Sequence, residues 1–160
     1  MKLNRILAAT ALAATTLSAP THAAGDSRIA LNAGISNFTA GLGLGMEVHL
    51  TDKFALSAGA GTLGSLVVGS LYYVNGYNRG LYLGAGYGVV EKSETRVNDN
   101  WETQKLKGAI GVVGYKLTLA NDNYWRFGGG LVKRLDDDKY DPEDDKKLRM
   151  AMDITFGHRF

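Results

Sequence analysis

Apolar and polar side chains alternate along most of this chain, and the alternation is plainest in residues 148–160. This segment reads LRMAMDITFGHRF, and every second position from Leu148 to Phe160 is apolar except His158. The positions between them are charged, polar or small. Successive side chains of a β-strand point to opposite faces, so the segment predicts a strand with one apolar and one polar face.

The same period of two predicts further strands over residues 28–36, 41–50, 54–61, 80–89 and 124–133. In each of them the bulky apolar residues share one face, and the other face carries mostly glycine, alanine and serine. Two more strands are expected over residues 66–74 and 105–117, where apolar residues occupy both phases. Which face of these two points outward stays open, and a bulge could reconcile the two phases of 105–117. The expected total is eight strands.

The connections between these strands form two alternating sets. Residues 51–53, 75–78 and 118–123 are short and rich in turn formers. The other set comprises residues 37–39, 62–65, 91–102 and 134–147, and its last two members are long and charged. Short turns at one end and longer loops at the other end are typical of an outer-membrane β-barrel. The loops 91–102 and 134–147 are therefore the expected surface-interaction segments.

The N-terminal residues have the pattern of a secretory signal. Lys2 and Arg5 precede an apolar, alanine-rich run over residues 6–19, and Thr21-His22-Ala23 offers a small residue at both positions that a signal peptidase inspects. The run is too short for a transmembrane helix and Pro20 interrupts it. We therefore expect a cleaved signal peptide over residues 1–23 and one domain over residues 24–160.

The composition of the chain limits the kinds of partner and of chemistry that we expect for it. Removing Lys2 and Arg5 from the 18 basic residues leaves 16, which equals the 16 acidic residues, so nothing suggests a nucleic-acid partner. The chain has no cysteine, which excludes disulfides, thiolate metal sites and a lipoprotein anchor. After residue 23 no run of 18 apolar residues occurs, so we expect no transmembrane helix.

These features together resemble the small eight-stranded outer-membrane β-barrel proteins of Gram-negative bacteria, such as OmpX and the transmembrane barrel of OmpA. The most specific part is MDITFGHRF at residues 152–160, where Met152, Ile154, Phe156 and Phe160 match the C-terminal signal that the outer-membrane insertion machinery reads. The glycine-rich run 41–45 is also similar to the YfaZ group.

The resemblance implies an all-β fold, an eight-stranded antiparallel up-and-down transmembrane β-barrel. It also implies export through the periplasm to the outer membrane. The implied partners are outer-membrane lipid, lipopolysaccharide and the assembly machinery, and the implied state is a monomer.

A barrel in lipid must close on itself, because unpaired backbone groups are costly there. Eight strands leave an interior that holds little more than side chains, which fits the small residues of the polar face and predicts a closed lumen. We expect the charged residues of that face to form ion pairs in the lumen, with both carboxylates bound by arginines: Glu47, Arg126, Arg149, Asp153 and Arg159. Aromatic residues beside the short turns should form a belt at the membrane interface: Tyr72, Tyr73, Tyr77, Tyr115, Tyr124, Trp125 and Phe160.

The sequence offers little for catalysis. His49 and His158 are the histidines that follow the signal region, and neither precedes a serine in the arrangement of the lipid A deacylases that share this architecture. The acidic run within 134–147 lacks the central glycine of an EF-hand, so we expect a solvated loop there. We expect no catalytic residue, no metal and no cofactor, and a structural or surface-interaction role. Two alternatives stay open: a lipid A-modifying enzyme, and a soluble periplasmic lipocalin-like ligand binder with its apolar face inside.

Overall fold

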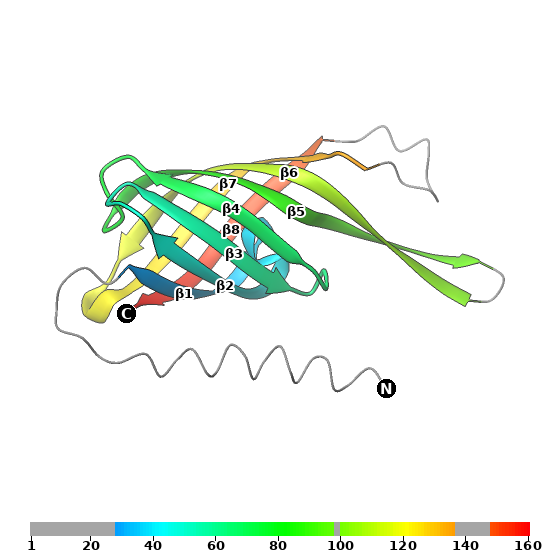
Figure 1. The fold of residues 1–160 in the computed structure, drawn as a ribbon, viewed down its shortest axis with the longest axis horizontal. Coiled ribbons are helices and arrows are strands. Elements are labelled where there is room, and N and C mark those ends of the chain that lie inside the picture. The colour runs from blue at the N-terminus through cyan, green and yellow to red at the C-terminus, as the bar shows by residue number, and fades with distance from the viewer. Residues whose placement is uncertain (1–27, 98–99, 137–147) are drawn as a thin grey trace.

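The computed structural model describes residues 28–97, 100–136 and 148–160 (Figure 1). The predicted signal peptide over residues 1–23 lies outside the described residues. Eight strands follow one another along the chain: β1 (Ile29–Ser36), β2 (Gly41–His49), β3 (Phe54–Gly61), β4 (Leu66–Tyr73), β5 (Gly80–Val97), β6 (Asn100–Thr118), β7 (Asn123–Arg134) and β8 (Leu148–Arg159). Two short 3-10 turns join them, η2 (Asn37–Thr39) and η3 (Ala120–Asp122).

Each strand pairs antiparallel with the next, and β1 pairs with β8 to close the sheet into a barrel. The closing register runs from Ala30 opposite Arg159 to Ser36 opposite Asp153. The predicted eight-stranded antiparallel up-and-down barrel is therefore confirmed. The C-terminus lies at the same end of the barrel as η3, and a long β5–β6 hairpin projects from the other end (Figure 1).

The two faces of the barrel differ in the way that the alternation predicts. Large apolar side chains such as Leu44, Leu83 and Phe127 are exposed on the outer face, whereas Glu47 and Arg126 are buried inside. Among the described residues no helix is long and apolar enough to cross a membrane. The apolar surface of this protein is thus carried on the outside of its sheet.

The structure shows which residues of the strands predicted over 66–74 and 105–117 point outward, a question that the sequence left open. In β4, Val67 and Leu71 point inward and Leu66 and Val68 point outward. In β6, Leu106, Ile110, Val112 and Lys116 are buried, whereas Val113 and Tyr115 are exposed. β6 keeps one phase throughout residues 105–117, so the bulge considered there is absent.

The register shift lies on the partner strand instead, between Val89 and Glu91 of β5. Val89 was expected on the apolar outer face, but it is buried beside this irregularity. A bulge of this kind places two residues against one on the neighbouring strand, which changes the phase of everything that follows it.

The prediction of a loop over residues 91–102 is wrong. β5 and β6 stay paired beyond the barrel, from Glu91 opposite Leu106 to Val97 opposite Asn100. The segment contains no glycine or proline, and its asparagine and aspartate residues are confined to Asn98-Asp99-Asn100. A two-stranded ribbon with both faces in water can carry charged residues, so charge alone did not distinguish it from a loop.

The connection between β1 and β2 turns into the barrel. Phe38 and Thr39 of η2 are buried, and η2 packs against strands on both sides of it, including β3, β4 and β8. The Ser36 hydroxyl accepts a hydrogen bond from the Phe38 N–H at 3.0 Å, and Thr39 Oγ1 donates to the Gly41 carbonyl at 2.7 Å. The short loop expected here at the surface is thus a plug of the lumen.

Inward-facing glycines make room for aromatic rings. A Cβ at Gly84 or Gly69 would lie 2.8 Å from an atom of the Phe38 ring. Gly114 lies opposite Tyr82 in the β5–β6 register, and a Cβ there would lie 2.5 Å from Tyr82 Cε1. The same relation holds for Gly157 and Tyr124 across β7 and β8. The glycines of the inner face therefore set the space in which large side chains fill the lumen.

This packing predicts different costs for two glycines of the same strand. Gly114→Ala forces its methyl group against Tyr82 and should destabilise the fold by about 1–3 kcal/mol. Gly111 faces outward, where an added Cβ meets its nearest atom at 4.0 Å, so Gly111→Ala should be neutral or slightly stabilising. Urea unfolding of both variants in detergent micelles checks this, and equal losses for the two would contradict the assignment of the inner face.

Candidate functional site

A single arginine bridges two carboxylates in the middle of the lumen. Arg126 on β7 donates from Nε to Asp153 Oδ2 at 2.5 Å and from Nη2 to Asp153 Oδ1 at 3.3 Å. Its Nη1 donates to Glu47 Oε1. All three side chains are at most 1 % exposed. Asp153 lies on β8 and Glu47 on β2, so this bridge joins strands on both sides of the closing β1–β8 pair.

The carboxylate of Glu47 is the most heavily bonded group of the barrel. Besides Arg126, its oxygens accept hydrogen bonds from the Tyr73 hydroxyl at 2.8 Å, from Asn32 Nδ2 at 3.0 Å and from the Tyr124 hydroxyl at 3.1 Å. Lys116 Nζ lies 3.9 Å from Glu47 Oε2. A buried carboxylate is tolerable only with such partners, because burial without them is strongly unfavourable.

The remaining charges of the cluster are also matched. Asp153 accepts a second hydrogen bond from the Tyr82 hydroxyl at 2.6 Å. The ammonium of Lys116 lies 3.8 Å from the centroid of the Tyr124 ring, a cation–π contact that stabilises this buried charge. Glu47 and Asp153 carry two negative charges against the two positive charges of Arg126 and Lys116. This lumen cluster, made of Glu47, Arg126, Asp153, Lys116, Tyr73, Tyr82 and Tyr124, is therefore balanced in formal charge.

Strand register positions the bridge. Arg126 lies opposite Thr155, and Asp153 lies opposite Gly128 in the β7–β8 pair, so the arginine and the aspartate are diagonal neighbours on one face. Gly128 has no side chain to stand between them. The distance across the barrel to Glu47 is covered by the long arginine side chain.

The structure brings together three of the five residues expected to pair in the lumen: Glu47, Arg126 and Asp153. The other two lie at opposite mouths of the barrel. Arg149 Nη1 is 2.8 Å from Glu91 Oε1 near the β5–β6 hairpin, and Arg159 contacts Asp122 of η3. Neither of these arginines contacts Glu47 or Asp153, since each stands at an end of β8.

The expected aromatic belt needs a correction. Tyr73 and Tyr124 point into the lumen, where their hydroxyl groups bind Glu47. The Tyr77 ring packs against the His49 ring at a centroid distance of 4.7 Å, tilted by 45°. The other four expected members lie exposed on the outer face: Tyr72, Tyr115, Trp125 and Phe160. Of the proposed C-terminal signal residues, Met152, Ile154, Phe156 and Phe160 all lie on this outer face.

Sequence reasoning missed Lys116 and the roles of the tyrosine hydroxyls. Lys116 shares its phase with Leu106, Ile110 and Val112, so assigning that phase would have placed it inside. Nothing in the sequence indicates which hydroxyls reach Glu47, because that depends on which strands face one another across the lumen.

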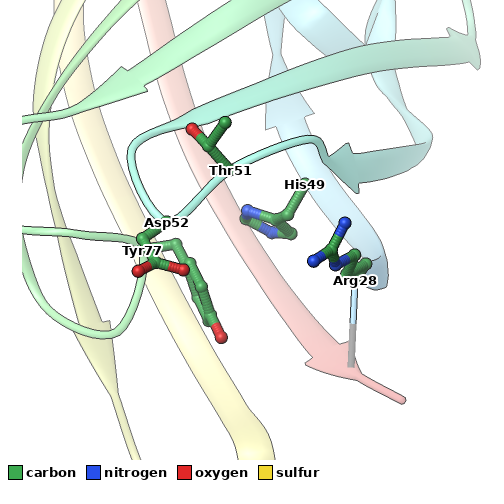
Figure 2. Close-up of a pocket in the computed structure, with 5 residues that line it drawn as sticks. All are labelled: Arg28, His49, Thr51, Asp52 and Tyr77. Carbon is green, nitrogen blue, oxygen red and sulfur yellow. The ribbon is translucent and has the colours of Figure 1, made fainter. Parts of the chain in front are cut away.

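A shallow pocket opens beside the lumen cluster at the end of the barrel that holds the short turns. It is lined by Arg28, His49, Thr51, Asp52 and Tyr77, with His49 reaching into it from β2 (Figure 2). Its volume is about 20 Å³, close to the space of a single water molecule. Pockets for small organic ligands are typically about 300–1,000 Å³, so this pocket is far too small for one.

The two histidines of the described residues differ in their surroundings: His49 is buried with no hydrogen-bond partner at either ring nitrogen, whereas His158 is partly buried. His49 Nε2 lies 3.7 Å from Glu47 Oε2, and His158 Nδ1 lies 3.1 Å from Asn123 Oδ1. Within residues 28–97, 100–136 and 148–160, no group of three histidine, aspartate or glutamate side chains is placed to hold a metal ion. Most of the acidic run expected as a solvated loop, residues 137–147, lies outside the described residues.

Comparison of the chain with models of protein families, with curated proteins and with solved structures finds no match.

The lumen cluster predicts a strong and specific stability effect. Arg126→Leu leaves Glu47 and Asp153 buried without their main partner and should cost about 3–5 kcal/mol. The quadruple variant Glu47→Gln, Lys116→Met, Arg126→Met, Asp153→Asn removes all four charges of the cluster and should recover most of that loss. Unfolding by urea in micelles measures both.

Asp122→Asn serves as the control, because it removes an ion pair with Arg159 at the barrel mouth, where one partner is half exposed. Its expected cost is below about 1 kcal/mol. If Arg126→Leu were no more costly than Asp122→Asn, the bridge would not hold the barrel together.

Proposed function

We propose that this chain is an integral protein of the Gram-negative outer membrane, which crosses the bilayer as a β-barrel with a closed lumen. Its role is structural, or an interaction through its surface-exposed segments, and it is not an enzyme. The observation that carries the proposal is the distribution of polarity across the sheet. The outer face carries exposed large apolar side chains, and the buried inner face carries the charged residues Glu47, Lys116, Arg126 and Asp153 among small, aromatic and aliphatic residues.

This distribution is the reverse of that in a soluble barrel, whose apolar face lines the interior. Large apolar side chains are exposed on the outer face of all eight strands. Soluble monomers rarely expose a continuous apolar surface of more than a few hundred Å². A hydrocarbon solvent around the barrel accounts for the outer face, and closure of the sheet leaves no unpaired strand edge within it.

The dimensions of the apolar face support the same reading. Along β8 and the following Phe160, the exposed apolar row runs from Leu148 to Phe160, interrupted only by His158. Twelve residue steps at about 3.3 Å each, tilted by about 40°, span roughly 30 Å. This height is close to the hydrocarbon thickness of a bilayer, about 30 Å. Tyr72, Tyr115, Trp125 and Phe160 would then lie at one interface, where aromatic residues are favoured.

The lumen argues against transport of solutes. Arg126, Glu47 and Asp153 span the interior, and Phe38 of η2 fills the space against Gly69 and Gly84. Eight strands enclose no water-filled channel when the interior is occupied by side chains. Any binding of a partner must therefore be made by segments outside the bilayer. Among the described residues, the β5–β6 hairpin reaches farthest from the barrel (Figure 1) and is the leading candidate.

In the proposed orientation the short turns and Phe160 face the periplasm and the β5–β6 hairpin faces the outside of the cell. The partners during biogenesis are the outer-membrane assembly machinery and the surrounding lipid and lipopolysaccharide. The mature protein, residues 24–160, follows removal of the signal peptide.

The proposal predicts a heat-modifiable outer-membrane protein. When the full chain is expressed in a Gram-negative host, it should fractionate with the outer membrane. Unboiled samples should migrate differently from boiled samples in a detergent gel, because a closed barrel with paired edges resists unfolding by detergent. A soluble periplasmic protein without this shift would refute the proposal.

The proposed C-terminal signal predicts an effect on assembly that exceeds its effect on packing. Phe160→Ala should lower the folded, heat-modifiable fraction in cells severalfold, because the assembly machinery reads this aromatic residue. Tyr115→Ala removes another exposed outer-face aromatic near the same end and should leave assembly nearly unchanged. Both proteins, refolded in vitro, should show similar stability, and equal assembly of the two variants in cells would count against the signal.

A further inference from the structure

We propose that the outer face of β6 and β7, at the end of the barrel away from Phe160, binds the phosphate group of an outer-leaflet lipid. This inference rests on the proposed function, since it needs the apolar face to be in a bilayer. The site is a lysine patch made of Lys105 and Lys107 on β6 and Lys133 on β7.

Strand alternation places the three lysines on the same outer face. Their neighbours in the chain, Leu106 and Val132, are buried inside the barrel, whereas the lysines themselves are exposed. Lys133 lies opposite Ala109 in the β6–β7 register, two positions from Lys107. Lys107 and Lys133 are therefore diagonal neighbours, whose backbones are about 7–8 Å apart, a spacing that lets two ammonium groups reach one phosphate.

The ammonium group of Lys105 is held at the β3–β4 turn, where its Nζ donates to the Gly64 carbonyl, so the groups that remain to bind phosphate are those of Lys107 and Lys133. Within the part of the chain that the structure describes, no carboxylate pairs with the ammonium group of Lys107 or Lys133. Asp136 approaches only the backbone, where its Oδ2 accepts a hydrogen bond from the Lys107 N–H at 3.0 Å. Lys92, which lies opposite Lys105, is paired with Glu94.

Apolar side chains lie directly below the lysines. Lys133 is opposite Leu148, and Leu131 is opposite Met150, which is 90 % exposed. A lipid whose acyl chains contact Leu131 and Met150 would have its phosphate at the height of Lys133. Lysine suits this position, because its methylene stem packs along apolar surface while its charge stays in the polar layer.

The charge is confined to one side of the barrel. At the same end, β1 to β4 present Ile35, Leu42, Ala60 and Leu66 on the outer face, with no charged residue. A general requirement for solubility would spread charge around the whole rim. Here the lysines lie on neighbouring strands, above a continuous apolar surface. This arrangement is complementary to an anionic lipid that has two or more acyl chains. A phosphorylated glycolipid of the outer leaflet has this chemistry.

The test uses the full mature chain refolded in dodecylmaltoside micelles, with EDTA present so that divalent cations cannot bridge carboxylates to phosphate. Bisphosphorylated lipid A is titrated in, and native mass spectrometry measures the bound lipid. Lys107→Gln/Lys133→Gln is compared with Lys53→Gln/Arg79→Gln, which removes the same charge from exposed residues at the other end. Dephosphorylated lipid A and inorganic phosphate are titrated in parallel.

We expect the wild type and the Lys53/Arg79 variant to bind lipid A alike, and the Lys107/Lys133 variant to bind it roughly tenfold more weakly. The wild type should bind dephosphorylated lipid A about as weakly as the Lys107/Lys133 variant binds bisphosphorylated lipid A. Equal binding by both variants would overturn the inference. So would binding of inorganic phosphate as tight as that of lipid A, since the site would then take a free anion.

A separate measurement distinguishes failure of the inference from failure of the proposed function. All variants are first tested for insertion into phosphatidylcholine vesicles, with the heat-dependent gel shift as the readout. If the variants insert into vesicles but bind lipid A equally, the lipid site is contradicted and the outer-membrane proposal is not. Absence of insertion by the wild type contradicts the outer-membrane proposal itself, and with it the lipid site.

Discussion

The pairing of β1 with β8 is the constraint on which the rest of this structure depends. By closing the sheet at eight strands, it removes both free edges and fixes a narrow interior. Every inward side chain must then fit a space that no other element can enlarge. Arg126, Glu47 and Asp153 meet because β7, β8, β1 and β2 are successive strands of this closed ring.

The narrow interior accounts for the unusual composition of the inner face. Charged and aromatic side chains are large, so glycine must face them: Gly114 faces Tyr82, Gly157 faces Tyr124, and Gly84 accommodates Phe38. The tyrosines serve two purposes, since their rings fill volume and their hydroxyls bind carboxylates. The lumen therefore combines a polar network of matched charges and hydrogen bonds with an apolar cluster that includes Phe38, Val67 and Leu71.

With the polar groups turned inward, the apolar groups are left for the outside. In the outer membrane that we propose for this protein, hydrocarbon would cover the exposed apolar rows of β2, β5 and β8. Under that proposal, contacts with partners other than the lipid tails depend on two places where the barrel differs from this pattern. One is the β5–β6 hairpin, which continues as a polar ribbon past the barrel, and the other is the lysine patch at its base.

Period-two alternation in the sequence by itself determined the strand count, the outward phase of most strands and the inward placement of Glu47, Arg126 and Asp153. These follow from local geometry, because successive side chains of a strand must point to opposite faces. Tertiary structure alone decided the phases of 66–74 and 105–117, where both faces are apolar, and the entry of Phe38 into the lumen. It also decided that 91–102 stays paired and that Arg149 and Arg159 stand apart from the central carboxylates. The reason is physical: phase is a property of one strand, whereas contacts across the lumen depend on register and curvature of the whole closed sheet.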